Sequence, residues 1–212
     1  DYILSKNIDE YSFDEKDTDR VLFRGFNVCA DVNHLDKIDM MKMSYDNPDK
    51  YDFKMSSTRM HPIWGKNIVS RSLLEFWNNN RGLSTDIDLF RDYFSIDNFM
   101  SYNDMFRHRY IATVGSAKNN KWYLSNSVVI EYKFKNKEFF HEVLFRDMDS
   151  IVYFDNTENI EDKINRLSAD DYKLARENIR KRKELYMKYL HYPNLIKWYG
   201  LFLLEYGNKF KV

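Results

Sequence analysis

The chain has little cysteine, glycine or proline, and its charges cancel. Its 212 residues include one Cys, six Gly and three Pro, while 33 Lys and Arg balance 33 Asp and Glu. Because one Cys cannot form an internal disulfide and no Asn-X-Ser/Thr acceptor occurs, we expect a reducing, cytoplasmic compartment, or a lumenal one if a signal precedes Asp1. Zero net charge argues against nucleic acid as a partner, since binding along a phosphate backbone requires surplus cations. No apolar run approaches the roughly 20 residues that span a membrane.

Short motifs that identify common enzyme classes are also missing. The sequence has no Gly-rich dinucleotide fingerprint, no phosphate-binding loop and no Gly-X-Ser-X-Gly elbow. No two of its five His have the spacing of metal ligands. What is present is a 43% hydrophobic fraction rich in aromatic residues, which is too high for a disordered chain. Length and composition therefore predict one globular domain, or one and a fraction.

Short apolar runs alternate with helical periods along the chain. The runs predict strands at residues 21–23, 51–55, 110–114, 127–132 and 151–154. Apolar spacings of three and four residues predict helices at 35–43, 68–77, 121–124, 157–167, 168–189 and 193–206, with Ser168 and Asp171 as a weak capping box. Residues 97–107 read as helical or irregular. This alternation is typical of an α/β fold with a parallel sheet, which binds ligands beyond the carboxyl ends of its strands.

The first predicted strand is followed directly by Arg24 and Gly25, which we expect to form a turn. An Arg there can hold a phosphate group through two hydrogen bonds, and a Gly lets the backbone approach a ligand closely. The alternative is an Arg that forms an ion pair within the turn and binds no ligand. The turn at residues 115–118, after another predicted strand, is a second candidate position.

Three Asp-X-Asp triplets could supply paired carboxylates to a divalent cation. A chain with 22 Asp contains about that many by chance, so the triplets carry little information. Of the three, Asp147 and Asp149 lie just before a predicted strand.

Two features near the C-terminus have ordinary structural interpretations. The basic run at residues 176–183 spreads around a predicted helix, so we expect a solvated helix face. Aromatic residues at helical spacing predict core packing; they are Tyr189, Tyr192, Trp198, Tyr199, Phe202 and Tyr206.

Four segments, taken in order, resemble glycosyltransferase family 90, the family of protein O-glucosyl/xylosyltransferases and capsule-associated xylosyltransferases. The segment Val21-Leu22-Phe23-Arg24-Gly25 resembles the family's strand that ends in Phe-Arg-Gly. The segment His108-Arg109-Tyr110-Ile111 resembles its His-Lys-Tyr-Leu strand, with Gly115 placed like the glycine that follows. Residues 127–130 with 138–140 resemble a later stretch of the family, and Tyr153, residues 159–167 and residues 175–178 resemble its C-terminal part. The Asn, Lys and Ile bias suggests an AT-rich genome and a small viral or protist member.

The resemblance implies a GT-B fold, in which the C-terminal of two Rossmann-like halves binds the sugar nucleotide. This chain would then be the donor-binding half: a Rossmann-like parallel sheet flanked by helices, with a C-terminal helical extension. Residues 1–19 would be a linker or the remnant of an N-terminal acceptor domain, and residues 20–190 the donor-binding domain. Residues 191–212 would form a helix that packs back toward the N-terminal half.

The resemblance also implies a reaction and a donor site. The reaction is inverting, metal-independent transfer of xylose or glucose from a UDP-sugar to a hydroxyl of a glycan or glycoprotein, with no cofactor. The matching donor-site positions are Arg24, Gly25, Phe26, Lys118, Ser127 and Glu138. Arg24 would contact the diphosphate, and Lys118 stands where the family has a second Arg, with Lys121 as its alternative. Phe26 replaces a family Ser. The catalytic base is expected in an N-terminal half, because only 23 residues precede Arg24.

Two other functions stay open on the sequence. One is a metal-dependent glycosyltransferase of the GT-A type that uses Asp147 and Asp149. The other is a non-catalytic carbohydrate-binding module, since abundant Tyr and Trp suit stacking on sugars as well as core packing.

Overall fold

The computed structural model describes residues 11–26, 40–41, 43–56, 93, 98–114, 120–132, 145, 151–154 and 160–209. The chain divides into two compact units, which are described separately. The N-terminal unit is Tyr11–Val114, and the C-terminal unit is Gly115–Val212 together with Asp1–Glu10. The domain boundaries expected from the sequence, at residues 19 and 190, stay predictions.

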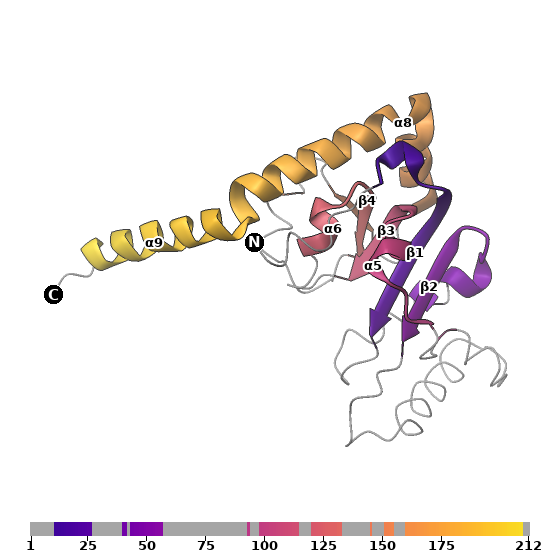
Figure 1. Cartoon of the computed structure of the whole chain (residues 1–212), viewed down its shortest axis with the longest axis horizontal. Helices are drawn as coiled ribbons and strands as arrows, with labels where there is room; N and C mark the ends of the chain where they lie inside the picture. Colours follow the sequence, from indigo (N-terminus) through magenta and orange to yellow (C-terminus); the bar gives the residue numbers. More distant parts are fainter. Residues whose placement is uncertain are drawn as a thin grey trace, which may run out of the picture. The chain divides into compact units, whose positions relative to one another are not determined.

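The described strands confirm the α/β class with a parallel sheet. The N-terminal unit contains β1 (Thr18–Phe26), β2 (Tyr51–Ser56) and β3 (His108–Val114), and β1 pairs in parallel with both of the others. The C-terminal unit contains β4 (Val128–Tyr132) and β5 (Val152–Phe154), also parallel (Figure 1). The strand order is β2-β1-β3 in the N-terminal unit, and β4 lies beside β5 in the C-terminal unit. All five strands fall where apolar runs predict them.

The register of β1 against β2 places two phenylalanines on one face of the strand pair and paired charges on the other. Phe23 pairs with Phe53, and because partners in parallel strands share a face, their rings meet edge to face with centroids 6.2 Å apart. Both rings are buried. Alternation along the strands then sends Arg24 and its partner Lys54 to the opposite face. Arg24, Asp52 and Lys54 therefore lie on one side of the strand pair, together with the buried Leu22.

The turn predicted at Arg24 and Gly25 is wrong, because both residues lie inside β1 and pair with Lys54 and Met55. The neighbouring strand supplies a partner as far as Ser56, so β1 continues past the glycine. Gly25 has a packing reason instead: a Cβ there would lie 2.6 Å from Cζ of Phe23. The sequence analysis expected a ligand to approach the backbone at Gly25, but the space beside its Cα is filled by the Phe23 ring.

The described helices of the N-terminal unit are all short, whereas the C-terminal unit also contains two long ones, α8 and α9. The former holds η1 (Phe13–Glu15), helical residues 40–41 and 43–46 at the end of a predicted helix, and α5 (Tyr102–Met105). The latter holds α6 (Asn120–Leu124), α8 (Ile160–Leu185), the π-helical turn η3 (Tyr186–Leu190) and α9 (Tyr192–Lys209). Residues 68–77, another predicted helix, lie outside the described part.

Helix α8 joins the two predicted helices across a kink rather than a cap. Asp170, Asp171 and Tyr172 have φ of 48°, 52° and 59°, in the left-handed region that Asp tolerates better than most residues. The predicted capping box is wrong, because the Ser168 hydroxyl donates back to the Ile164 carbonyl at 2.9 Å. Ser168 therefore belongs to the end of the first arm.

The C-terminal unit is organised around a fully buried arginine. Arg182 donates from Nε to the Tyr123 carbonyl at 3.0 Å, from Nη1 to the Ser127 carbonyl at 2.8 Å and from Nη2 to the Ser125 carbonyl at 2.5 Å. These bonds tie α8 to the connection between α6 and β4. The prediction of a solvated face for residues 176–183 is therefore wrong for Arg182. It lies three residues after the buried Ile179, on the inner side of the helix.

Helix α9 exposes the aromatic residues that the sequence predicts to be core. Tyr192, Trp198, Tyr199 and Phe202 are 56–69% exposed, whereas Tyr189 packs partly against the core around Tyr123 and Phe145. In Figure 1, α9 (yellow) continues beyond η3, and it runs past Gly207, the predicted end. Within the described residues, no helix is both long enough and apolar enough to cross a membrane.

Replacing Gly25 by Ala is expected to destabilise the N-terminal unit by about 1–3 kcal/mol, because the new methyl group overlaps the buried Phe23 ring. Chemical denaturation measures this change. Gly200→Ala is the matched control: no atom lies within 4 Å of its Cβ position, and in helix α9 Ala is favoured over Gly by up to about 1 kcal/mol. Equal destabilisation by both changes would contradict this packing.

Replacing Arg182 by Ala is expected to cost at least about 3 kcal/mol, since it leaves three carbonyl oxygens without their buried donor. Arg180→Ala is the control on the same helix. Its ion pair with Glu184 is exposed on both sides, so its loss should change the unfolding free energy by less than about 0.5–1 kcal/mol. Similar unfolding curves for the two variants would refute the buried role of Arg182.

Candidate functional site

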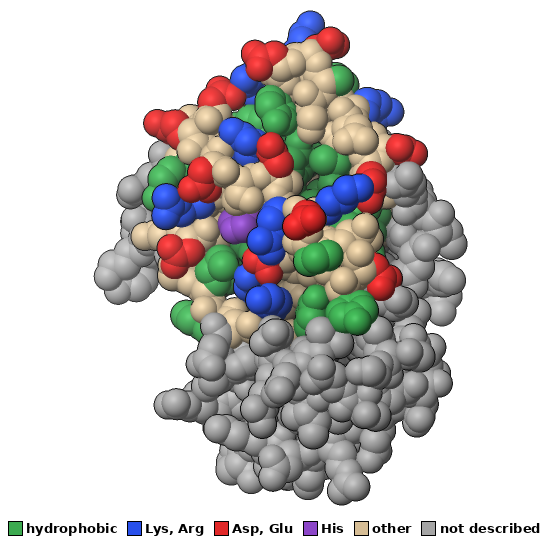
Figure 2. All heavy atoms as spheres, turned by 90° about the vertical axis from the view of Figure 1, so that its right-hand side faces the viewer, with side chains coloured by type: hydrophobic (Ala, Val, Ile, Leu, Met, Phe, Trp, Pro, Cys, Tyr) green, Lys and Arg blue, Asp and Glu red, His purple; other side chains and the backbone are tan. Residues whose placement is uncertain are grey.

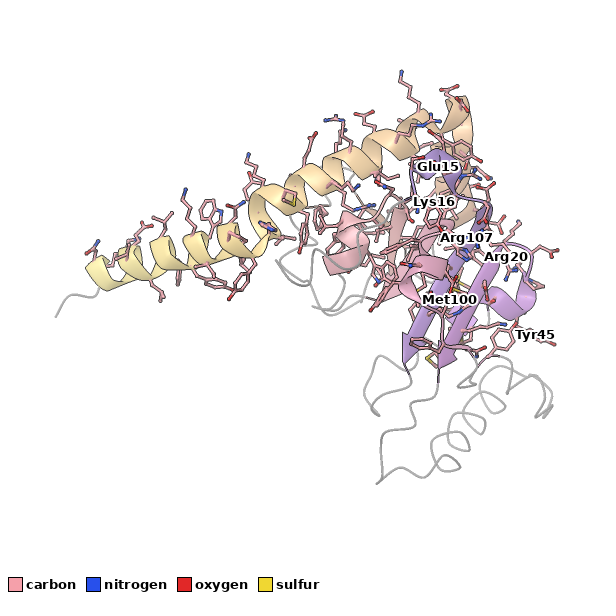
Figure 3. All side chains as sticks on the ribbon, in the orientation of Figure 1. Glu15, Lys16, Arg20, Tyr45, Met100 and Arg107 are labelled. Carbon is pink, nitrogen blue, oxygen red and sulfur yellow. The ribbon has the colours of Figure 1, made fainter. Side chains whose placement is uncertain are left out.

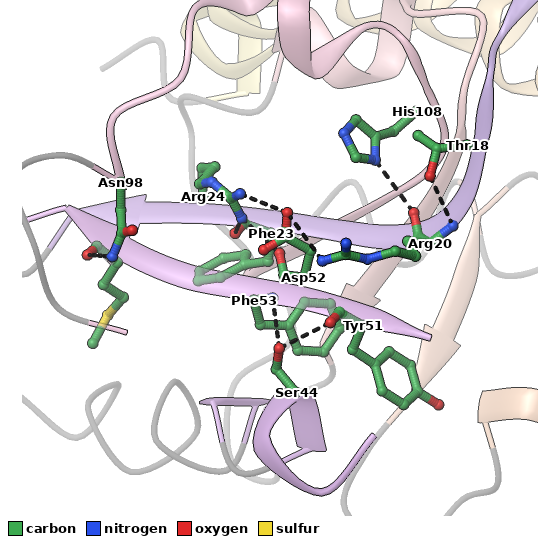
Figure 4. Close-up of polar contacts among 11 residues, drawn as sticks. Thr18, Arg20, Phe23, Arg24, Ser44, Tyr51, Asp52, Phe53, Asn98 and His108 are labelled. Carbon is green, nitrogen blue, oxygen red and sulfur yellow. Dashed lines mark hydrogen bonds and ion pairs between the residues drawn. The ribbon is translucent and has the colours of Figure 1, made fainter. Parts of the chain in front are cut away.

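Arg24 is a buried cation in the last third of β1. Its side chain is 8% exposed. The guanidinium donates from Nη1 to the carbonyls of Phe23 and Asp52, at 2.9 and 2.6 Å, and from Nη2 to Oδ2 of Asp52 at 2.7 Å (Figure 4). Of the two interpretations left open by the sequence, the structure thus shows the ion pair, formed between two strands.

Asp52 lies between two arginines. Its Cα partner on β1 is Leu22, midway between Arg20 and Arg24, and Oδ2 lies 3.4 Å from Nη2 of Arg20. Burial alone would raise the pKa of the Asp52 carboxyl, but the hydrogen bond and charge of Arg24, with the charges of Arg20 and Lys54, outweigh it and lower that pKa. Asp52 is therefore a carboxylate at neutral pH.

His108 begins β3 beside this cluster. Its Nδ1 lies 3.4 Å from the Arg20 carbonyl. Burial lowers the pKa of His108, and the hydrogen bond to Arg20 together with the Asp52 carboxylate only partly offsets this. The imidazole is therefore neutral at pH 7. It adds no third cation to the pair of arginines.

The Arg24–Asp52 pair is incompletely hydrogen-bonded. Nε of Arg24 and Oδ1 of Asp52 are both buried, and neither has a partner. Three of the five N–H groups of Arg24 donate hydrogen bonds, so two remain able to donate to a ligand. Most buried polar atoms in proteins have a hydrogen-bond partner. The two atoms of Arg24 and Asp52 that have none mark a position where a further polar group can bind.

The strand order places Arg24 where α/β sheets bind ligands. In the N-terminal unit the chain passes from β1 to β2 on one side and then to β3 on the other. Ligands bind beyond the carboxyl ends of the strands at such a reversal. Arg24 is two residues from the end of β1. The site thus combines a buried cation, spare donors and a favourable position.

The predicted donor-site residues are not all described, and two of them belong to different units. Gly25 and Phe26 follow Arg24 in β1, with the Phe26 side chain outside the described part. Lys118, Glu138, Asp147 and Asp149 lie outside the described residues, as does the side chain of Lys121. Ser127 is in the C-terminal unit. The donor-binding roles of these residues stay predictions.

Ser127 is fully buried at the amino end of β4, directly before Val128. Its backbone N–H donates to the Ser125 hydroxyl at 3.3 Å, and its carbonyl accepts from Arg182. These contacts give Ser127 a structural role in the C-terminal unit.

Sequence reasoning missed Asp52 and Arg20. The alternation of residues 51–55 does predict that Asp52 points away from the buried Tyr51 and Phe53. The strand register that brings it to Arg24 depends on the pairing of segments 28 residues apart. No local pattern reports that register.

The surface around these strands has no single sign of charge. Figure 2 shows Lys and Arg side chains interspersed with Asp and Glu over the described part of this face. Arg107, labelled in Figure 3, is an example: it pairs with Asp17 at 3.2 Å, and both side chains are more than half exposed. The described residues contain no group of three or more His, Cys, Asp and Glu side chains arranged to hold a metal ion.

The C-terminal unit has a pocket between β5 and the two arms of α8. Its volume is about 490 Å³, and its charged lining mixes both signs: Asp162, Lys163, Arg166, Glu177 and Lys181. Lys181 pairs with Glu177 at 3.0 Å, and Lys163 donates to the Tyr153 carbonyl at 2.5 Å. Two of the three cations that line the pocket are thus bound to partners within the protein.

Asp52 should make stability depend on acid pH. Because its folded pKa lies below the ordinary 3.8, it stabilises the fold above that value, and the contribution is lost as pH falls through the folded pKa. We expect Asp52→Asn to be less stable than wild type at pH 7 but to lose less further stability below about pH 4. Urea denaturation across this range is the measurement. Parallel pH profiles would contradict the ion pair.

Comparisons with known proteins support the fold. No protein-family model matches the sequence, and no curated protein sequence matches it. The structure of TarM superposes with a TM-score of 0.50 at 16% identity, covering 92% of this chain and 36% of TarM. The C-terminal domain of LpcC, a glycosyl transferase group 1 family protein from Francisella tularensis, gives a TM-score of 0.42 at 12% identity, covering 88% of this chain and 94% of that domain.

The likeness to TarM concerns the fold alone. The chain spans about a third of TarM's length. The specific resemblance to family 90 is not confirmed by these comparisons. The parallel strand pairs of the two units and the superposition on TarM together show a Rossmann-like α/β fold.

Proposed function

We propose that the protein is a glycosyltransferase that takes xylose or glucose from a UDP-sugar and transfers it to a hydroxyl group of a glycan or glycoprotein. The observation that carries the proposal is Arg24, a buried cation with spare donors near the carboxyl end of β1 in a Rossmann-like sheet. The fold likeness to TarM and the ordered segments that resemble family 90 support it.

Arg24 would act on the leaving group. In the proposed inverting reaction, the acceptor oxygen attacks the anomeric carbon while the bond from that carbon to the β-phosphate oxygen breaks. The electron pair passes to UDP, and the acceptor proton passes to a general base. Arg24 would stabilise the negative charge that develops on the diphosphate, with Lys118 as a second cation and no metal ion.

The other donor-site residues belong to the proposal through the family resemblance. Ser127 and Glu138 match positions near the donor, and Gly25 and Phe26 follow the diphosphate-binding Arg. Xylose and glucose differ by one hydroxymethyl group, so the volume of the sugar pocket would decide between them.

A second candidate function is a non-catalytic carbohydrate-binding module. Trp198 and Tyr199 favour it, because they are 56% and 62% exposed on α9 and aromatic rings stack on sugars. Release of UDP from UDP-xylose or UDP-glucose separates the two functions, since only an enzyme turns the donor over.

Arg24→Ala should weaken UDP binding by roughly 1.5–3 kcal/mol, as expected when a charge-assisted hydrogen bond is lost. Isothermal titration calorimetry with UDP, with and without EDTA, measures this directly. Arg107→Ala is the matched control, since its exposed pair with Asp17 lies at the other end of the strands, and it should leave UDP affinity unchanged.

Three outcomes would change the proposal. No UDP binding up to millimolar concentration would remove the donor function, and unchanged affinity in Arg24→Ala would remove Arg24 from the site. Binding that EDTA abolishes and Mn²⁺ restores would favour the metal-dependent GT-A alternative with Asp147 and Asp149.

A further inference from the structure

We propose that Asp52 occupies the place of a phosphate group at Arg24, and that it transfers its ion pair to Arg20 when a phosphate-bearing ligand binds. The inference deepens the proposed function and rests on it for the identity of the ligand, a nucleoside diphosphate. It concerns how affinity for that ligand is set.

The first step is that the hydrogen bonding between Arg24 and Asp52 is incomplete. A carboxylate and a guanidinium can join through two parallel hydrogen bonds that satisfy both oxygens and two N–H groups. Here the side chains share one bond, from Nη2 of Arg24 to Oδ2 of Asp52 at 2.7 Å. Oδ1 and Nε stay buried without partners, which costs free energy. A tetrahedral phosphate that engaged Nε and Nη2 together would remove the cost at Arg24.

The second step is that Asp52 has another cation within reach. Arg20 lies four residues before Arg24 on β1, so both side chains fall on the same face. Its Nη2 is already 3.4 Å from the oxygen that Arg24 holds, and its side chain is 45% exposed and able to adjust. Figure 4 shows the Asp52 carboxylate between the two guanidinium groups. A small rotation of Asp52 would therefore exchange one arginine for the other.

The third step is the charge balance. Two arginines and one carboxylate leave the cluster with a net charge of +1, and Lys54, the register partner of Arg24, adds a further cation near Asp52. A phosphate oxygen that replaces the carboxylate keeps Arg24 compensated, while Arg20 compensates the displaced Asp52. No buried charge is left alone at any stage, which is the condition for a low-cost exchange.

The test is calorimetric titration of the full chain with inorganic pyrophosphate and with UDP. In Asp52→Asn the amide oxygen still accepts from Arg24, but the competing charge is gone. We expect both ligands to bind about 5–10-fold more tightly, a typical size for a coupling between sites. Arg20→Gln should bind about 3–10-fold more weakly, because Asp52 then has no second arginine. Asp17→Asn removes an exposed carboxylate from the same unit and should change neither affinity.

The double variant separates this exchange from general electrostatics. If Arg20 acts through Asp52, Arg20→Gln should have no effect once Asp52 is Asn; if it only adds positive charge, it should weaken binding equally in both backgrounds. Unchanged or weaker binding in a folded Asp52→Asn variant, or an equal effect of Arg20→Gln in both backgrounds, overturns the proposal. Should Asp52→Asn fail to fold, unchanged affinity in Arg20→Gln alone overturns it, since Arg20 is half-exposed.

Failure of this inference is distinguishable from failure of the proposed function. Tighter pyrophosphate binding in Asp52→Asn without turnover of any UDP-sugar would support the exchange and reject the transferase. UDP-sugar turnover that depends on Arg24 but has the same UDP affinity in Asp52→Asn would support the transferase and reject the exchange. Absence of pyrophosphate and UDP binding in every variant would reject both.

Discussion

The positive charge of Arg24 is almost completely buried, and the charged face of β1 and β2 is arranged to compensate it. The parallel register places Asp52 between Arg20 and Arg24, so one carboxylate serves two guanidinium groups. A slip of one residue would send Asp52 to the apolar face and leave Arg24 buried without an anion, a change that typically costs several kcal/mol. The ion pair and the strand register therefore support each other.

The charge of a second buried arginine is also compensated, but by backbone carbonyls rather than by a carboxylate. Arg182 is compensated by three backbone carbonyls, one at the end of α6 and two in its connection to β4, and these contacts position that connection on α8. Arg24 instead forms an ion pair with a carboxylate, and two of its five N–H groups donate no hydrogen bond. This contrast makes Arg182 a structural residue and Arg24 the candidate for binding an anion. Zero net charge for the whole chain is compatible with both.

The strands could be predicted because apolar runs are local patterns, and most residues of these runs are buried. The predictions that were wrong concern residues whose neighbours come from elsewhere in the chain. Gly25 is predicted to form a turn, yet pairing with β2 continues β1 past this residue. Arg182 is predicted to be solvated, yet it is buried and donates to backbone carbonyls that include that of Ser127. The aromatic residues of α9 read as core, and among the described residues they are exposed.

The sequence by itself determined the fold class, the places of the strands and the choice of Arg24 as a candidate, because hydrophobic periodicity and the position after an apolar run are local properties. Only the tertiary structure decided what Arg24 meets. Asp52 lies 28 residues away, and its contact depends on a strand register set by all the pairs of β1 and β2 together. A buried charge is compensated by whatever the fold brings to it, and a linear pattern does not contain that information.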